Sequence, residues 1–457
     1  MKLMRTGIAL GVAALALAGC SVFGGGGDNK PKTPTIGERI PILTSESSAE
    51  LDPSHAYVAD LHPPATDNEE WSHTGGNAAK EKEHLALANA LAKAWTAEID
   101  GTTKFVRLAS SPVVGEGKVF VVDTYARLHA FDLQTGRKLW VSQVGAPDDV
   151  KGGISLWTGE MTGNRGSLFG GGASYEAGVV YATNGLGDAA AFSAADGKQL
   201  WKVRPGGPLR GAPTVGIGQI FVMSQDNQLF ALNATNGELI WNEAAALETS
   251  GVFGVAAPAL AQGTVVAGFS SGELSAYRYE NGRALWGDTL SRTSISTTVA
   301  SLSDIDASPV SDRGRVFAIG QGGRMVSLEL VTGQRLWEVN VAGISTPWVA
   351  GEWVFVVDDQ ARLLCLARST GKVRWVSKLP RWKNEKKKSG AIVWTSPVLA
   401  GDRLILASSE GDLVNVDPTT GAIQSQTEAG DSVSLPLVVA GRTLLVLSSD
   451  GRLTAWR

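Results

Sequence analysis

Few side chains in this sequence could perform covalent or metal chemistry. The chain has 457 residues and only two cysteines, Cys20 and Cys365. Two cysteines cannot build a multi-cysteine zinc site or a disulfide framework. The five histidines are His55, His62, His73, His84 and His129. A lone histidine in a strand-like run, as at His129, is more often a packed residue than the base of a Ser-His-Asp triad. The sequence therefore argues against hydrolytic and zinc chemistry.

Motifs that hold phosphates or cofactors are also missing from the sequence. There is no P-loop and no HExxH motif, and Gly170-Gly171-Gly172 lacks the following helix that phosphate binding requires. Cys365 lies in the apolar run Leu363–Leu366, where we expect a buried, unreactive thiol. We therefore expect no catalytic residue, no cofactor and no metal.

The charge balance excludes one class of partner. Lys and Arg number 41 against 45 Asp and Glu, which gives a formal charge of −4. A protein without a basic excess is poorly suited to grip a phosphate backbone, so we expect no nucleic acid partner. One local exception is the loop 381–388, which contains Lys386, Lys387 and Lys388. It is either a solvated loop or a docking surface for an acidic partner or lipid head groups.

The elements that carry these residues follow from a repeat. Glycine supplies 55 residues, which indicates many tight turns. Three segments of thirty residues share one pattern: Ser111–Trp140, Ala212–Trp241 and Ser308–Trp337. Looser copies end at Trp201, Trp286 and Trp375, and another covers Ser396–Ser425, with Ser425 in the place of the tryptophan. The short β-branched runs within each copy are typical of a four-stranded propeller blade.

Two positions of the repeat have predictable structural roles. A glycine in each turn supplies the positive φ of a tight hairpin, at Gly136, Gly197, Gly237, Gly282, Gly333, Gly371 and Gly421. Four residues later a tryptophan returns on the outer strand, where we expect it to cover the seam between blades. These tryptophans are therefore not interpreted as a ligand cage.

Counting the copies predicts how the ring closes. The last copy, Leu435–Arg457, ends before its own tryptophan, while residues 92–99 around Trp95 read like the missing strand. We therefore predict an all-β fold over residues 92–457: an eight-bladed β-propeller of four-stranded antiparallel blades. An N-terminal strand completes the C-terminal blade.

The residues before the repeats are predicted to be a secretion signal followed by a flexible linker. Lys2 and Arg5 precede the apolar run 7–19, which is too short to span a membrane and is typical of a signal peptide. Small residues before Cys20 resemble the bacterial lipobox, so we expect residues 1–19 to be removed and Cys20 to be lipidated. The Pro- and Gly-rich composition of residues 20–70 predicts a flexible tether, followed by an extension over 71–91. Within residues 80–94, Ala, Leu, Lys and Glu predict a short helix.

The repeat resembles a known type of propeller. Ala130-x-Asp132-x-x-Thr135-Gly136-x-x-x-Trp140 is similar to the repeat of pyrroloquinoline quinone (PQQ) dehydrogenase-type propellers. That fold serves enzymes and scaffolds alike. The lipobox, tether and eight blades together resemble the BamB family, lipoproteins of the outer-membrane β-barrel assembly (BAM) machinery. The resemblance implies a protein anchored by lipid in the outer membrane and facing the periplasm; Ser21 is not the Asp that retains lipoproteins in the inner membrane.

The resemblance also implies candidate binding residues. The stretch Leu302-Ser303-Asp304-Ile305-Asp306 is similar to the Leu-Ser-Asp-Val-Asp stretch of the family, whose aspartates contact the polypeptide-transport-associated (POTRA) repeats of BamA. Asp304 and Asp306 are therefore candidates for binding BamA. The alternative is that Asp304 caps a turn and Asp306 faces solvent.

A second family contact, a Leu-x-Leu-Arg-Gly loop, aligns with the segment containing Val252 and Phe253. The arginine is absent there, and Phe253 could serve instead as an apolar contact. Arg210, in Leu209-Arg210-Gly211, matches the motif locally but lies one blade too early, so we treat it as a weaker alternative.

The function that the resemblance implies is a non-enzymatic scaffold. It would bind BamA and other BAM subunits, assist the folding and insertion of outer-membrane β-barrel proteins, and possess no cofactor. Two alternatives are a PQQ-dependent periplasmic dehydrogenase and an envelope polysaccharide-binding propeller. The dehydrogenase alternative is disfavoured because the sequence has no vicinal Cys-Cys pair.

Overall fold

The computed structural model describes residues 51–54, 62–103, 106–145, 153–154, 161–162, 169–247, 256–290 and 303–457. Every regular element in these ranges is a β-strand. No helix in the same ranges has the length and apolar character needed to cross a membrane.

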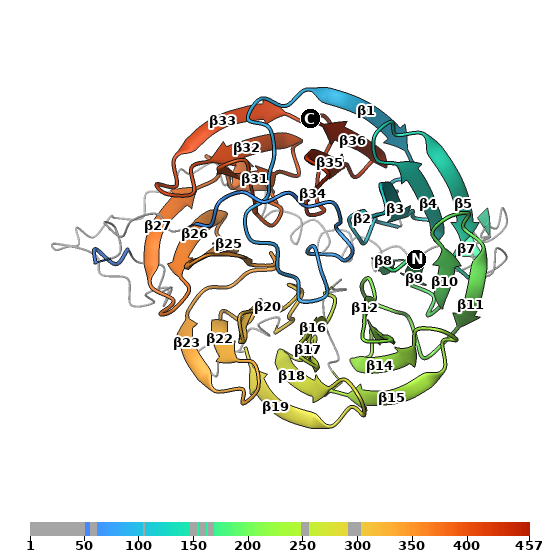
Figure 1. Ribbon diagram of the computed structural model, residues 1–457. Coiled ribbons are helices and arrows are strands. Elements are labelled where there is room, and N and C mark those ends of the chain that lie inside the picture. Colours follow the sequence, from blue (N-terminus) through green and yellow to red (C-terminus); the bar gives the residue numbers. More distant parts are fainter. Residues whose placement is uncertain are drawn as a thin grey trace, which may run out of the picture. The chain divides into compact units, whose positions relative to one another are not determined.

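Eight four-stranded antiparallel sheets are arranged around a ring, as predicted from the repeat (Figure 1). The first four blades comprise β2 (Val113–Gly115), β3 (Lys118–Val122), β4 (Arg127–Asp132) and β5 (Lys138–Gln143); β8 (Gly171–Glu176), β9 (Val179–Asn184), β10 (Ala189–Ser193) and β11 (Gln199–Val203); β12 (Thr214–Gly216), β13 (Gln219–Met223), β14 (Gln228–Asn233) and β15 (Leu239–Ala244); and β16 (Ala259–Ala261), β17 (Thr264–Gly268), β18 (Glu273–Arg278) and β19 (Ala284–Thr289).

The next three blades comprise β20 (Val310–Asp312), β21 (Arg315–Ile319), β22 (Met325–Glu329) and β23 (Arg335–Val339); β24 (Trp348–Ala350), β25 (Trp353–Val357), β26 (Arg362–Ala367) and β27 (Val373–Lys378); and β30 (Val398–Ala400), β31 (Arg403–Ala407), β32 (Asp412–Val416) and β33 (Ile423–Glu428). Two short hairpins lie outside the blades: β6 (Gly153–Ile154) with β7 (Met161–Thr162), and β28 (Trp382–Asn384) with β29 (Ser389–Ala391).

The eighth blade joins the two ends of the chain. It contains β34 (Val438–Ala440), β35 (Thr443–Leu447) and β36 (Arg452–Trp456), and its outer strand is β1 (Lys93–Glu98). Strands β1 and β36 pair antiparallel, with Thr96 opposite Thr454. The predicted closure by residues 92–99 is confirmed.

Burial explains the sequence of each strand. The inner strands are mostly buried because they are covered by blades on both sides; every residue of β25 is buried. Most outermost strands are largely exposed, and every residue of β33 is exposed, whereas β27 is mostly buried. The core is therefore distributed around the ring between neighbouring blades.

The repeated tryptophans hold adjacent blades together, which is the structural role predicted for them. Each one donates its indole N–H to a backbone carbonyl of the next blade, for example Trp201 Nε1 to Ala234 O at 3.0 Å. Its ring lies against the turn glycine of that blade, which is Gly237 for Trp201. The same arrangement recurs at Trp95, Trp140, Trp241, Trp286, Trp337 and Trp375.

The missing tryptophan at Ser425 has a structural reason. Ser425 lies in β33, whose neighbour is the eighth blade. The outer strand of that blade, β1, comes from the other end of the chain, so no covalent turn connects it to β36. Without that turn there is no turn glycine for a tryptophan to cover.

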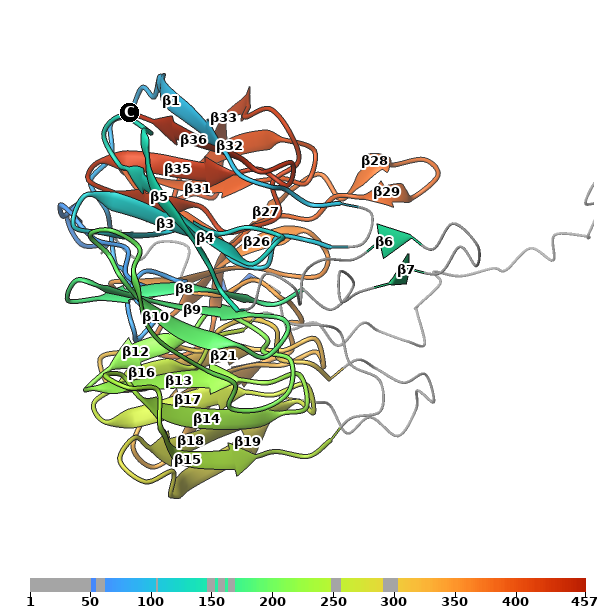
Figure 2. The same ribbon diagram turned by 90° about the vertical axis from the view of Figure 1, so that its right-hand side faces the viewer.

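Residues 66–85 form a belt across one face of the ring, in irregular conformation with turns at 74–75 and 78–79 (Figures 1 and 2). The belt contacts the blades in ring order through Asn68, Trp71, Ser72, His73, Ala78, Ala79, Glu83 and Leu85, whose partners are Gly441, Val114, Tyr175, Val215, Leu260, Ser311, Trp348 and Leu399. All eight blades are thus contacted at least once. The predicted helix over 80–94 is wrong, because these residues pair with the inner strands and then enter β1.

The opposite face carries the connections that run from the outer strand of one blade to the inner strand of the next. The hairpins β6–β7 and β28–β29 belong to two such connections and lie on the side away from the belt (Figure 2). Arg210, Asp304 and Asp306 also lie in such connections, before β12 and β20. We call this surface the connection face.

Candidate partner-binding site

The two candidate aspartates lie in the connection between β19 and β20. Asp304 is buried, with 1% of its surface exposed. The Asp306 side chain is 9% exposed. The neighbouring Ile305 is buried, and its N–H donates to the Phe269 carbonyl at 3.2 Å, which fixes the connection against the fourth blade. Asp306 is therefore not a solvent-facing loop residue.

Arg210 supplies the positive charge at this site. Its side chain is 1% exposed, and its Nη2 lies 3.3 Å from Asp306 Oδ1. It comes from the connection before β12, two blades before the blade that Asp306 enters. Sequence register placed Arg210 too early to join the aspartates, but the ring brings these two connections together.

Burial controls the electrostatics of this cluster. Loss of water raises the pKa of the Asp306 carboxyl to about 6; the Arg210 charge opposes this rise and the Asp304 charge adds to it. Burial also lowers the pKa of the Arg210 guanidinium, against the two carboxylates. The side-chain amide of Gln321 donates to Asp306 Oδ2, and its backbone N–H donates to the Asp304 carbonyl at 2.9 Å.

The cluster therefore ties together three parts of the connection face: the segment before β12, the segment before β20 and the β21–β22 turn that carries Gln321. A buried, paired arginine and its carboxylates position backbone rather than attack a substrate. The cluster's chemistry is that of a structural support for the connection face.

Three other predicted residues cannot be located. Cys20, Val252 and Phe253 lie outside the residues that the structure describes. Their predicted roles in lipidation and partner contact stay predictions.

The remaining reactive side chains of the propeller have structural partners. His129 is buried in β4, and its Nε2 lies 2.7 Å from Asp123 Oδ2. The same carboxylate also accepts the Arg127 Nε–H at 2.8 Å. Cys365 is fully buried in β26, opposite Phe355 and Trp375. Neither residue lines the cavities described below.

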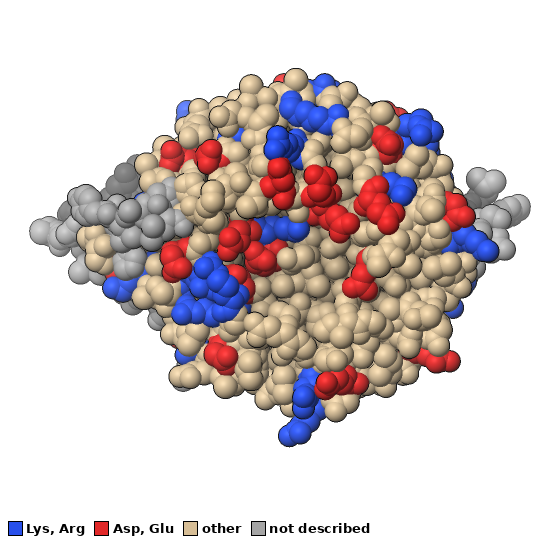
Figure 3. Space-filling model, in the orientation of Figure 1, with Lys and Arg blue, Asp and Glu red and all other residues tan. Residues whose placement is uncertain are grey.

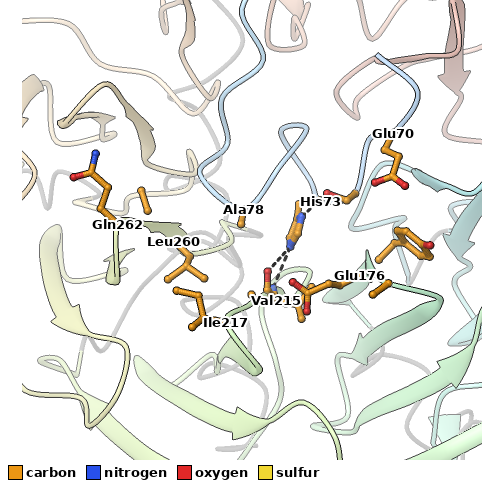
Figure 4. A pocket seen from close by; sticks show the side chains of 13 residues that line it. Glu70, His73, Ala78, Glu176, Val215, Ile217, Leu260 and Gln262 are labelled. Atoms are coloured by element: carbon orange, nitrogen blue, oxygen red, sulfur yellow. Dashed lines mark hydrogen bonds between the residues drawn. The ribbon is translucent and has the colours of Figure 1, made fainter. Parts of the chain in front are cut away.

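Sequence reasoning missed a polar site beneath the belt (Figure 4). A cavity of about 390 Å³ lies between the belt and the second, third and fourth blades, and its lining includes Glu70, His73 and Glu176. His73 Nε2 lies 3.1 Å from the Val215 amide N and 3.0 Å from its carbonyl O. Burial holds the pKa of His73 well below its ordinary value, so the ring is neutral.

Lys80 strengthens the same attachment. It is buried, its Nζ donates to Thr214 Oγ1 at 2.9 Å, and burial lowers its pKa to about 7. The sequence signal was the polar cluster 71–76, which has no place in the repeat. His73 and Lys80 therefore both attach the belt to the third blade, which is a structural role.

Two groups of side chains could offer metal ligands within the described residues. In one, His62, His84 and Asp402 place ligand atoms within 4.8 Å of one another. However, His84 Nδ1 lies 2.7 Å from the Pro63 carbonyl, and its Nε2 accepts the Asp402 N–H at 3.0 Å. Both ring nitrogens already serve to hold the belt's approach to the seventh blade. The other group, Glu81, Glu83 and Asp312, has only carboxylates, and Asp312 pairs with Arg368 at 2.7 Å.

Charge on the belt face is mainly acidic near its centre. Figure 3 shows acidic side chains spread across the middle of this face, over the belt. The belt contributes Asp67, Glu69, Glu70, Glu81 and Glu83 against Lys80 and Lys82. Lys386, Lys387 and Lys388 instead extend from the hairpin β28–β29 on the connection face.

The fold defines the class: an eight-bladed propeller of PQQ-type repeats whose described reactive groups are buried in structural roles. The solved structure of BamB from Moraxella catarrhalis is similar, with a TM-score of 0.63 and 17% identity, covering 80% of this chain and all of that one. A europium-containing methanol dehydrogenase is also similar, with a TM-score of 0.62 and 14% identity, covering 83% of this chain and 89% of that chain. These two likenesses establish the fold alone.

Sequence comparison identifies the family. A family model described as outer membrane protein assembly factor BamB matches residues 86–153, 148–377 and 380–456, so the chain belongs to this family. The chain is 28% identical over 370 residues to the BamB of Burkholderia pseudomallei, covering 79% of this chain and 87% of the relative. It is 25% identical over 344 residues to that of Moranella endobia, covering 75% and 84%. The family resemblance seen in the sequence is confirmed.

Proposed function

We propose that this protein is a non-enzymatic scaffold of the outer-membrane β-barrel assembly machinery, which binds the POTRA repeats of BamA and assists the folding and insertion of outer-membrane β-barrel proteins. Membership of the assembly-factor family supports this role. The observation that carries it is the buried Arg210–Asp306 pair, which fixes the connection face beside Asp304. Connecting loops that are held in place by a buried charge cluster present a pre-formed surface for recognition.

The anchoring that we propose follows from the sequence. Removal of residues 1–19 and lipidation of Cys20 would attach the chain to the outer membrane, with the propeller facing the periplasm. The segment after Cys20 would then act as a linker to the propeller.

Co-purification with BamA from a detergent extract tests the partner. The charge-reversing pair Asp304→Lys with Asp306→Lys is unsuitable, because two further cations would be buried beside Arg210. Asp304→Asn with Asp306→Asn removes both charges at nearly constant volume. We expect this variant to retain clearly less BamA than wild type. A control with Asp196→Asn and Asp417→Asn, an exposed and a half-buried turn residue of other blades, should retain all of it. If wild type retains no BamA, the proposed partner is wrong.

The non-enzymatic part has its own test. Protein incubated with PQQ and Ca²⁺ should neither bind the quinone nor reduce a dye with an alcohol substrate. Quinone-dependent dye reduction would contradict the proposal and favour the dehydrogenase alternative.

A further inference from the structure

The connection face carries an apolar groove beside the arginine–aspartate cluster. Its volume is about 700 Å³, and its lining includes Gln321, Ile344, Trp382, Ile392, Val393 and Trp394. One wall is the hairpin β28–β29, and the other is formed by the connection between β23 and β24 and by the turn after β25. We call it the hairpin groove.

The groove exposes apolar side chains to solvent. Ile344 is 49% exposed and Val393 is 45% exposed, although both lie in irregular segments where polar residues would be the ordinary choice. Single exposed apolar residues need no explanation, but two in one concave site with tryptophans indicate a contact surface.

The wall of the groove is held in place before anything binds. Trp394 is buried and donates its indole N–H to the Pro380 carbonyl at 2.9 Å. The Arg381 guanidinium lies 5.3 Å from the centre of the Trp382 ring and also contacts the Gln360 side chain. A pre-formed wall reduces the entropy cost of binding.

Charge around the groove favours an acidic partner. Lys386, Lys387 and Lys388 are exposed at the tip of the hairpin. On the opposite rim, the Asp358 carboxylate is neutralised locally by Arg362, whose Nε donates to Asp358 Oδ2 at 2.7 Å. The segment 381–388 carries Arg381 and four lysines against Glu385, so the hairpin whose base lines the groove is net positive, although Asp359 also lines the groove.

The groove is continuous with the cluster. Gln321 lines the groove and also donates to Asp306. Asp304, Asp306 and Arg210 are too buried to provide the roughly 800 Å² per partner that a stable protein interface covers. Exposed apolar area must therefore be supplied next to them, and the hairpin groove is where the described residues supply it.

We propose that the hairpin groove docks an acidic segment of BamA that presents at least one large apolar side chain. The apolar side chain enters between Ile344 and Val393, while its acidic neighbours face the lysines at the hairpin tip. This inference rests on the proposed function and names a contact surface that the family's aspartate motif does not include.

The test measures binding of purified BamA POTRA repeats to the purified propeller protein. Ile344→Glu with Val393→Glu should weaken binding by about tenfold or more, because two charges would be placed in the apolar contact. Ile344→Ser with Val393→Ser should weaken it less but in the same direction. The matched control is Val331→Glu with Leu239→Glu, two residues that are 60% and 53% exposed on other blades, and it should bind as wild type does.

The lysines are tested separately. Lys386→Glu with Lys387→Glu and Lys388→Glu should weaken binding most at low ionic strength and less as salt is added. If wild type binds and the Ile344 and Val393 variants bind equally well, docking in the hairpin groove is wrong but the proposed function stays intact. Failure of wild type to bind overturns both. If the lysine variant loses only its affinity for anionic vesicles, the lysines contact lipid head groups and the acidic partner segment is wrong.

Discussion

Arg210 Nη2 lies 3.3 Å from Asp306 Oδ1, although the two residues are 96 positions apart in the chain. One approaches from the connection before β12 and the other from the connection before β20, and a whole blade separates those strands in the ring. The pair therefore links two connections that are a blade apart on the connection face.

Removing the arginine tests how much this link contributes to stability. Arg210→Ala leaves two buried carboxylates without their cation, so we expect it to lower the free energy of unfolding by about 3 kcal/mol at pH 7. Urea unfolding measures this loss. Replacing both members of the pair, Arg210→Met with Asp306→Leu, should recover part of this loss, since one buried carboxylate, that of Asp304, then remains instead of two. A double variant as unstable as Arg210→Ala would contradict the assignment.

The same cluster predicts an unusual pH dependence. The folded-state pKa of Asp306 is about 6, above its ordinary value of 3.8. The folded state therefore binds more protons than the unfolded state, so the contribution of Asp306 to stability is complete below pH 3.8 and is lost as pH rises through 6. Between pH 4 and pH 7, Asp306→Asn should gain roughly 2 to 3 kcal/mol relative to wild type. Parallel stability curves for the two proteins would show that the carboxyl titrates normally.

The seam between blades can be tested with two glycines of matched backbone conformation. Gly237 has φ +77°, and a Cβ there would lie 2.7 Å from the Trp201 ring; Gly218 has φ +74° and open space around it. Both alanine variants share the backbone cost of about 1 to 2 kcal/mol, but only Gly237→Ala adds overpacking of about 1 to 3 kcal/mol. Thermal and urea unfolding should rank Gly237→Ala clearly below Gly218→Ala. Equal losses would mean that the tryptophan does not constrain the turn.

The belt predicts an asymmetry between two truncations. A chain that begins at residue 51 keeps all belt contacts, so its stability should match that of the full chain. A chain that begins at residue 92 exposes the sites of Trp71, Leu85 and Leu87, each of which contributes about 2 kcal/mol by burial before the cost of ordering the chain. We expect it to melt several degrees lower while keeping its strand content by circular dichroism. Equal melting temperatures would show that the belt contributes no net stability.

The fold could be predicted because each blade repeats the same sequence pattern. The Trp–Gly pairs predicted the seams, and the unfinished last copy together with Trp95 predicted the closure. The belt could not be predicted, because its Ala, Leu, Lys and Glu residues favour a helix in isolation, and only the ring of inner strands makes the irregular form better. Tertiary pairing overrides propensity there.

The site was only half predictable for a related reason. The motif around Asp304 and Asp306 was visible in the sequence, but whether they were buried, and which arginine joined them, depended on distances across the ring. The sequence shows how many blades separate two connections along the chain. It does not show that the connections of two non-neighbouring blades meet in the ring, as those of Arg210 and Asp306 do. The hairpin groove likewise combines segments that share no motif.

The belt also constrains the order in which the fold can be completed. Its docking positions are spread over all eight blades, and it is near the end of the chain that is synthesised first. The belt can therefore complete its contacts only after β34 to β36 have been synthesised and the ring has closed. A chain that stops before β34 would leave Asn68 without its partners at Val439 and Gly441, so the last blade to be made completes the attachment of a segment made long before it.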